Sequence, residues 1–180
     1  MIKMNSKQLR LSLGDEEIKK QLKHNPIYIV LDNVLDTYNI GAIFRLADGV
    51  AAEKIILCAG SETPPNSRIK KASINTTEWV NWEYNKTTLD AIIKLRAEVP
   101  GIYIVAVEQD TRSVSFQEIK YEFPIALVVG HETDGVSKEV LNVCDKIVEL
   151  PMYGVNISLN VMVSLGIVLY KVLEGLEKTG

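Results

Sequence analysis

Short apolar runs alternate with amphipathic stretches along most of this 180-residue chain. Runs rich in β-branched residues predict strands at 27–32, 53–58, 102–108, 124–130 and 146–150, and an aromatic run at 78–84 predicts an edge strand. Helical patterns fall between them at 39–51, 69–74, 87–99 and 158–176, with a brief helix starting at Ser137. Because strands that alternate with helices form right-handed crossovers, we expect an α/β fold with a mainly parallel sheet in three layers.

The last predicted helix is apolar almost all the way round, and a loop rich in Pro, Gly, Asn and Ser precedes it. On the simplest interpretation, Pro151 and Gly154 end a strand and either Asn156 or Ser158 caps the helix. That interpretation leaves several polar residues of the loop without a role.

Length and composition favour one domain. Hydrophobic residues make up 47% of the chain and the mean hydropathy is +0.07, which suits a single sizeable core. No apolar stretch reaches the ~20 residues of a membrane span, and the start lacks a signal-peptide core, so we expect a cytoplasmic protein without membrane contact. Cys58 and Cys144 lie far apart and predict free, buried thiols, without a metal site.

Charge is unevenly distributed along the chain. The net charge is −3, yet residues 1–24 carry six basic and three acidic residues, which leaves 14 basic and 20 acidic residues for the remainder. We therefore expect a basic N-terminal arm at 1–24 and the α/β domain at 25–180. Basic patches can follow RNA phosphates, although solvated helix faces look the same. The candidate RNA-binding residues in the arm and in the second basic segment, 67–71, are Lys19, Lys20, Lys23, Arg68, Lys70 and Lys71.

Three loops that follow predicted strands combine glycine with polar or charged residues: DTYNIGAIFR, GHETDG and PMYGVNISLN. Ligands in parallel sheets bind at the carboxyl ends of the strands. GHETDG does not match a Rossmann fingerprint, and no P-loop sequence is present. His131 by itself is more often structural than catalytic. Asn39 stands at a predicted helix start, either as a simple N-cap or beside an anion, and Arg45 would add a planar cation for a phosphate.

The order of the three loops resembles the SpoU/TrmH family of RNA ribose 2′-O-methyltransferases in the SPOUT superfamily. The matching patterns are Asn-x-Gly-x-x-x-Arg from Asn39, Gly-x-Glu-x-x-Gly from Gly130, and Leu-Pro-Met-x-Gly-x-x-x-Ser-Leu-Asn-Val from Leu150. The resemblance covers roughly residues 27–173, and the third pattern is the most specific. Met162 departs from the small or polar residue common in the family at that position.

The resemblance implies a C-terminal trefoil knot that binds S-adenosylmethionine, close backbone approach at Gly154, and a homodimer whose interface includes the last helix. That helix has more apolar surface than one sheet face can cover. The implied cofactor-binding residues are Val107, Glu108, Gly130, Leu150, Ser158 and Leu159. The implied catalytic or substrate-binding residues are Asn39, Arg45, Glu132, Ser158 and Asn160.

The implied reaction is attack of a ribose 2′-hydroxyl of tRNA or rRNA on the methyl group of the cofactor, with tRNA weakly favoured. No metal is required, because the sulfonium already activates that methyl group. A guanidinium stays charged up to pH ~12 and makes a poor base, so we expect Arg45 to position phosphate and to stabilise the developing alkoxide. Two alternatives stay open: methylation of a base by another enzyme of the knotted superfamily, and a non-catalytic RNA-binding module.

Overall fold

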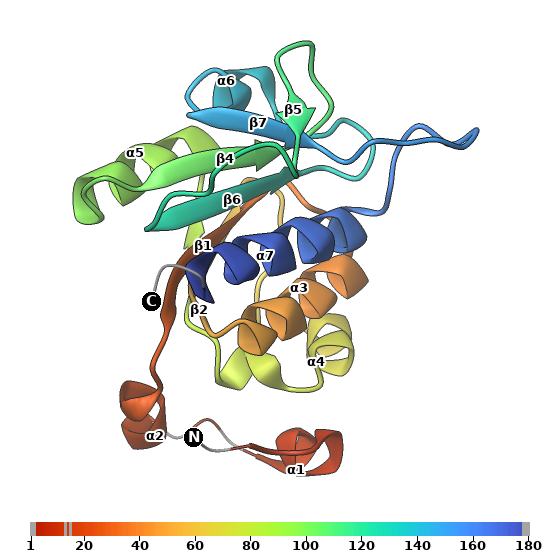
Figure 1. The fold of residues 1–180 in the computed structure, drawn as a ribbon. Coiled ribbons are helices and arrows are strands. Elements are labelled where there is room, and N and C mark those ends of the chain that lie inside the picture. The colour runs from red at the N-terminus through yellow and green to blue at the C-terminus, as the bar shows by residue number, and fades with distance from the viewer. Residues whose placement is uncertain (1–2, 13, 15, 178–180) are drawn as a thin grey trace.

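The computed structural model describes residues 3–12, 14 and 16–177, and its centre is a seven-stranded sheet (Figure 1). The strand order is β3-β2-β1-β6-β4-β7-β5, and every pair of neighbours is parallel. The predicted α/β class is confirmed. The strands are β1 (Asn25–Asp32), β2 (Ala52–Cys58), β3 (Trp82–Asn85), β4 (Tyr103–Val107), β5 (Val114–Ser115), β6 (Ile125–Gly130) and β7 (Lys146–Glu149).

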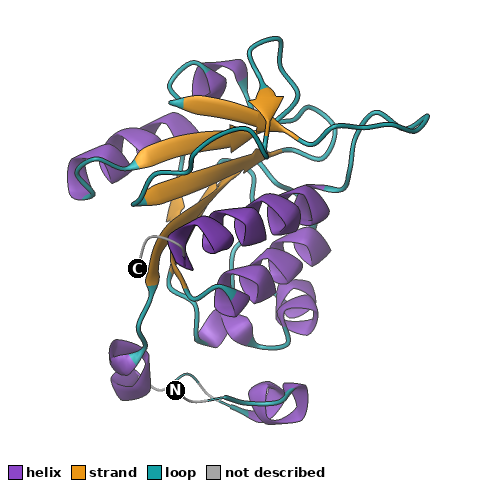
Figure 2. Cartoon of the chain, in the orientation of Figure 1, coloured by secondary structure: helices purple, strands orange, loops and turns teal. Residues whose placement is uncertain are grey.

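Helices cover both faces of the sheet, which gives the three layers visible in Figure 2. Alternate strand residues pack to opposite sides, so that Ile29 and Leu31 face the core under α3 and α7, while Val30 and Ile56 face the core under α5 and α6. The helices are α1 (Ser6–Leu11), α2 (Glu16–Gln21), α3 (Thr37–Gly49), α4 (Ser67–Ser73), α5 (Thr88–Glu98), α6 (Lys138–Leu141) and α7 (Val161–Glu177), with a 3-10 turn, η1 (Thr76–Glu78).

Most predicted elements are present, but the bounds of two were wrong and one short strand was not predicted. The expected strand at 78–84 begins instead as η1, and only Trp82–Asn85 pairs with β2. The short strand β5 was not expected. α7 starts at Val161 and not at Ser158, because the Asn160 side chain accepts a hydrogen bond from Met162 N–H at 2.9 Å. Asn160, rather than Asn156 or Ser158, therefore occupies the capping position.

The N-terminal arm docks on the domain through specific hydrogen bonds. Buried Asn75 donates from Nδ2 to the carbonyls of Leu9 at 3.2 Å and Ser12 at 2.6 Å. The indole N–H of Trp79 donates to the Ser12 hydroxyl at 3.0 Å. A Cβ at Gly14 would overlap the carbonyl oxygen of Glu78. These contacts hold Leu9, Ser12 and Gly14 against the segment that runs from α4 through η1 to Trp79.

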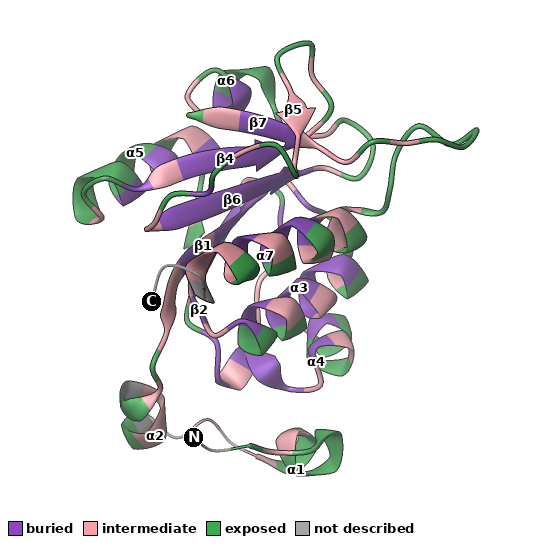
Figure 3. Ribbon diagram, in the orientation of Figure 1, coloured by how far each residue is buried: buried purple, intermediate pink, exposed green. Residues whose placement is uncertain are grey.

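The buried face of α7 belongs to this chain's own core. Leu165, Val168, Leu169 and Val172 are fully buried against the sheet and α3 (Figure 3). These four residues therefore need no partner chain to cover them, and the homodimer interface expected at this helix stays a prediction. The apolar residues that α7 leaves exposed are Val163, Ile167 and Tyr170.

Cys58 is buried and Cys144 is half-buried, and both are free thiols. Burial raises the pKa of each to about 12, so neither is a reactive thiolate near neutral pH. Among the described residues, no helix is both long and apolar enough to cross a membrane.

Candidate active site

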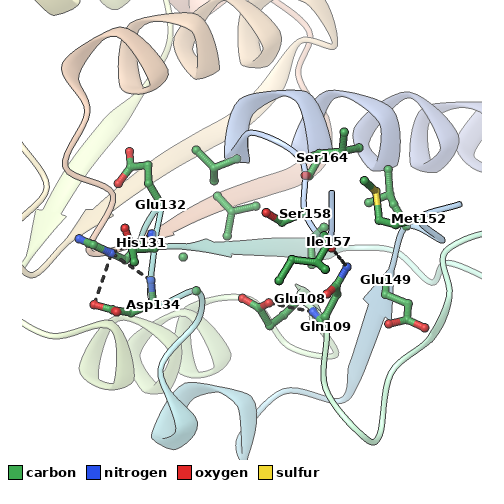
Figure 4. Close-up of a pocket in the computed structure, with 18 residues that line it drawn as sticks. Glu108, Gln109, His131, Glu132, Asp134, Glu149, Met152, Ile157, Ser158 and Ser164 are labelled. Atoms are coloured by element: carbon green, nitrogen blue, oxygen red, sulfur yellow. Dashed lines mark hydrogen bonds and ion pairs between the residues drawn. The ribbon is translucent and has the colours of Figure 1, made fainter. Parts of the chain in front are cut away.

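A pocket of about 290 Å³ lies at the carboxyl edge of the sheet, where parallel α/β folds bind ligands (Figure 4). Its walls come from the ends of β4, β6 and β7 and from the loop that leads into α7. All six residues expected to contact a cofactor line this one pocket: Val107, Glu108, Gly130, Leu150, Ser158 and Leu159.

Gly130 and Gly135 are required by close backbone contacts. A Cβ at Gly130 would overlap the backbone of Gly135 and Val136. Gly135 has φ of +70°, and a Cβ there would overlap the Glu108 carboxylate. His131 and Gly135 also exchange backbone hydrogen bonds of 3.1 and 2.9 Å. The pattern Gly-x-Glu-x-x-Gly thus encodes a tightly closed loop, 131–137, beside the pocket.

The ring of His131 organises this loop from within. Its Nδ1 accepts hydrogen bonds from the N–H groups of Thr133 at 3.1 Å and Asp134 at 3.2 Å (Figure 4). Nδ1 also lies 3.5 Å from a carboxylate oxygen of Asp134, so the contacts of this nitrogen stay within the loop 131–137. The structural interpretation of His131 is thereby supported over a catalytic one.

Two residues of the β4 end connect the walls of the pocket. Glu108 accepts hydrogen bonds from Gln109 N–H and from Val136 N–H, both at 2.8 Å. The Gln109 side chain donates to the carbonyl of Ile157 at 2.6 Å and so holds the loop before α7. Sequence reasoning did not single out Gln109; its position directly after a predicted strand was the only available signal.

Three expected site residues form a continuous chain of hydrogen bonds. Asn160 Nδ2 donates to Asn39 Oδ1 at 3.0 Å, and Asn39 Nδ2 donates to Glu132 Oε1 at 3.0 Å. Asn160 Oδ1 faces Met162 N–H, so the orientation of both amides follows from their partners. The true N-cap of α3 is Asp36. The N-cap alternative for Asn39 is therefore wrong: Asn39 is only 5% exposed, inside the first turn.

Glu132 also accepts hydrogen bonds from the N–H groups of Leu35 at 3.1 Å and Asp36 at 2.9 Å. Burial acts to raise the pKa of Glu132, but the hydrogen bonds from Asn39, Asp36 and Leu35 outweigh it and hold that pKa below its ordinary value. Glu132 is thus a carboxylate at neutral pH, and a poor base for a weakly acidic hydroxyl.

Arg45 is not one of the pocket-lining residues. It lies exposed on α3, one turn after Gly41, whose position faces α4 closely enough that a Cβ would contact Ala72. Residues four apart share a helix face, so Arg45 belongs to the side of α3 next to α4. No hydrogen bond or ion pair joins Arg45 to another described residue.

The expected RNA-binding lysines lie on the side of the molecule that carries α4 and the arm. Arg68, Lys70 and Lys71 are exposed on α4, and none forms an ion pair with a described residue. Lys19 and Lys70 together line a hollow of about 280 Å³ at the junction of arm and domain, which Glu78 also lines. Lys23 lines a separate groove beside the start of β1. The backbone of Lys20 is in α2, but its side chain lies outside the described part of the chain.

Two loop residues before α7 have few contacts. Ser158 is exposed at the pocket, and its N–H donates to Asn156 Oδ1 at 3.4 Å. Gly154 has open space where a Cβ would be, so the expected close backbone approach does not occur within the described chain. No group of three or more His, Cys, Asp or Glu residues in the described chain could hold a metal ion.

Comparison with known proteins finds relatives that are named as RNA methyltransferases. A curated tRNA (guanosine(18)-2′-O)-methyltransferase from Aquifex aeolicus is 33% identical over 173 residues, which cover 95% of this chain and 79% of that enzyme. The crystal structure of the A. aeolicus TrmH/SpoU tRNA modifying enzyme matches with a TM-score of 0.79 and 30% identity, over 97% of this chain and 84% of that one.

An AdoMet-bound rRNA methyltransferase from Sinorhizobium meliloti is 25% identical with a TM-score of 0.77, over 93% of this chain. This chain spans only 60% of the length of that protein. The family model described as the SpoU rRNA Methylase family matches residues 26–170, which is most of the chain and includes all three loops. The chain therefore belongs to the SpoU rRNA Methylase family.

Proposed function

We propose that this protein transfers a methyl group from S-adenosylmethionine to a ribose 2′-hydroxyl of tRNA or rRNA. One observation carries the proposal: the pocket that holds all six expected cofactor residues adjoins the hydrogen-bond chain of Asn160, Asn39 and Glu132. The similarity to the A. aeolicus tRNA enzyme favours tRNA over rRNA. We propose that the protein acts in the cytoplasm, where both kinds of RNA are available.

The pocket fits a cofactor with both polar and apolar parts. Its volume is near the lower end of the ~300–1,000 Å³ typical of small-molecule sites. Gly130 lets the ligand approach the backbone, Val107 and Leu150 offer apolar contact, and Ser158 offers a hydroxyl. When bound there, S-adenosylmethionine supplies an electrophilic methyl group.

The protein's own residues would position the acceptor and stabilise charge. Glu132 and Asn39 connect the loop 131–137 to α3, and Asn160 connects both to α7. Ser158 stands free at the pocket edge to contact the target ribose. Arg45 would hold an RNA phosphate and favour the developing alkoxide. Both oxygens of Glu132 already accept hydrogen bonds from Leu35, Asp36 and Asn39, so we propose that an RNA phosphate oxygen takes the proton instead.

We also propose that the C-terminal segment forms the trefoil knot implied by the sequence. β7 lies near one edge of the sheet, beyond β4, whereas α7 packs against α3 and β6 (Figure 1). The chain between them passes the β4 end, where Gln109 contacts Ile157. This return path supports threading of α7 past the loop after β4.

The cations on α4 and the arm support a path for the RNA backbone. Elsewhere in the described chain, Lys54 and Lys94 are both paired with Glu83. The α4 cations instead have no described ion-pair partner, and phosphate contact needs cations of this kind. We propose that RNA runs from the pocket past Arg45 and α4 to Lys19, so that residues 1–24 act as an RNA-binding arm on the 25–180 domain.

A homodimer through the last helix, α7, stays part of the proposal, with the exposed residues of that helix as its contact surface. The exposed side chains Val163, Ile167 and Tyr170 of α7 and Tyr38 of α3 form the apolar surface available to a second copy. Light scattering at micromolar concentration would contradict the dimer if it returned only the monomer mass.

Mass-spectrometric mapping tests the proposed reaction directly. The protein would be incubated with S-adenosylmethionine carrying a deuterated methyl group and with tRNA or rRNA from a deletion strain. We expect the label on a ribose, recovered as a nuclease-resistant dinucleotide. Label on a base would support the base-methylating alternative, and RNA binding without cofactor binding would support a non-catalytic module.

A further inference from the structure

A buried carboxylate outside the pocket contacts the loop 131–137. Asp32 ends β1, is 5% exposed, and pairs in register with Gly130 of β6. Its Oδ2 accepts a hydrogen bond from Ser137 N–H at 2.8 Å, and its Oδ1 accepts one from the hydroxyl of Thr88 at the start of α5. Neither Asp32 nor Ser137 lines the pocket.

The loop is held from the opposite side by a second carboxylate. β6 lies between β1 and β4 in the sheet. Glu108, just after β4, accepts Val136 N–H at 2.8 Å, while Asp32 of β1 accepts the next N–H along the chain. Two consecutive backbone donors are thus bound by carboxylates from the strands on either side of β6.

The two carboxylates fix the end of the loop, Val136 and Ser137, where the chain leaves the pocket. Residues 131–135 line the pocket, and the backbone bonds between His131 and Gly135 close them into one unit. Such a unit can tilt as a whole unless the residues that follow it, Val136 and Ser137, are held in place. Hydrogen bonds to a charged acceptor are stronger than neutral ones, and a buried carboxylate is stable only when its oxygens are satisfied.

We propose that Asp32 is a positioning residue for cofactor binding, acting through Ser137 N–H to hold the loop 131–137 against the pocket. The inference rests on the proposed function for its ligand, S-adenosylmethionine. The geometry of the anchor does not depend on the ligand, so the two can fail separately.

The test compares variants that separate loop anchoring from core stability. Asp32→Ala removes both acceptors, whereas Asp32→Asn can still accept Ser137 N–H through its amide oxygen while its amide nitrogen donates to Thr88. Asp32→Glu keeps a carboxylate but displaces it by one methylene. This variant replaces Asp32→Ala as the test of loop anchoring if the alanine variant does not fold. Thr88→Val is the matched control, because it removes only the bond on the α5 side of the same carboxylate.

Two measurements would be made on each variant: calorimetric affinity for S-adenosylmethionine and hydrogen exchange of the cofactor-free protein by mass spectrometry. Loss of a bond to a charged group predicts an affinity about tenfold weaker for Asp32→Ala, with faster exchange confined to residues 131–137. Asp32→Glu should weaken affinity in the same direction. Asp32→Asn keeps the bond to Ser137 N–H but loses its charge, so its affinity should fall by less than that of Asp32→Ala, and Thr88→Val should stay within about twofold of wild type.

Several outcomes would overturn the proposal. Unchanged affinity and exchange in Asp32→Ala would show that the loop does not need the anchor. An equal loss in Thr88→Val, or faster exchange across the whole sheet, would make Asp32 a general core residue. If Asp32→Asn lost as much as Asp32→Ala, charge rather than anchoring would matter. If wild type bound no cofactor, the proposed function would fail, and the exchange pattern alone would still decide the role of Asp32.

Discussion

Asn160 and Asn39 lie 121 residues apart and are joined by a 3.0 Å hydrogen bond between their side-chain amides. This bond connects the start of α7 to the first turn of α3, and Asn39 passes the connection on to Glu132. Each amide uses its oxygen as an acceptor and its nitrogen as a donor, so the chain has one direction. A substitution that turns a donor of this chain into an acceptor therefore breaks a hydrogen bond to a neighbouring residue.

Asn160→Asp tests this directionality with almost no change in shape. The carboxylate can still accept Met162 N–H, but it has no donor for Asn39 Oδ1. We expect a loss of about 1–3 kcal/mol in unfolding free energy and a lower methyl-transfer rate, measured by chemical denaturation and a radiolabel assay. Asn81→Asp, at an exposed asparagine that donates to Glu53, is the matched control. Equal stability of the two variants would refute the proposed chain.

Gly130→Ala should be strongly disruptive, because its Cβ would overlap backbone atoms that cannot move independently. We expect about 1–3 kcal/mol of destabilisation from overpacking and loss of S-adenosylmethionine binding by calorimetry. Gly154→Ala is the control, since its Cβ would enter open space and Gly154 does not line the pocket. Normal cofactor affinity in Gly130→Ala would mean that the loop can relax and that its close packing is not required.

Local pattern was sufficient to predict most of the fold. Buried strands such as Ile125–Gly130 read as continuous apolar runs because both faces of the sheet are covered. The strand predicted at 78–84 was wrong in part because its aromatic residues are typical of strands. In the structure, Asn75 is left-handed and Thr76–Glu78 form a 3-10 turn, and Asn75 is hydrogen-bonded to the N-terminal arm. That contact is between segments distant in sequence, which no local pattern encodes.

The site was predictable only in part for the same reason. The family resemblance named Asn39, Glu132 and Asn160, but their hydrogen-bonded order depends on how α3, α7 and the loop 131–137 meet. Gln109 and Asp32 carry no motif, and their roles follow from neighbours 48 and 105 residues away in the chain. Conversely, Arg45 matches a motif position, yet the fold places it outside the pocket of its own chain.

The lowered pKa of Glu132 predicts a pH dependence of stability. The native state favours the ionised carboxylate, so its contribution is complete above the ordinary pKa of 4.5 and is lost as pH falls through the lower folded value. We expect wild type to exceed Glu132→Gln in unfolding free energy at pH 7, with the difference shrinking below pH 4.5. Urea denaturation across this range measures it. Glu118→Gln is the exposed control, and a pH-independent gap for Glu132→Gln would contradict the assignment.

Replacing both Lys70 and Lys71 by Ala should weaken RNA binding and flatten its salt dependence. Each lysine that contacts phosphate contributes about 0.7 to 0.9 to the slope of log affinity against log salt concentration. Filter binding of bulk tRNA at several salt concentrations gives this slope. Lys94→Ala is the control, because Lys94 already pairs with Glu83 at 3.0 Å. If the double variant and the control had the same slope, α4 would not be on the RNA path.

Arg45→Lys should keep cofactor affinity but lose most methyl transfer. Lysine retains the charge of Arg45 and loses the planar fork that can contact two phosphate oxygens at once. Losing one preorganised charge-stabilising donor costs ~10²–10³-fold in turnover, so Arg45→Ala should be at least as impaired. Single-turnover rates on the mapped RNA would measure the loss, and calorimetry would check the cofactor. Arg112→Lys, which alters an exposed arginine paired with Asp110, should keep normal rates. Because Arg45 is exposed and lies on the α4 side of α3, a near-normal rate for Arg45→Lys would make it one more surface cation and remove it from the catalytic set.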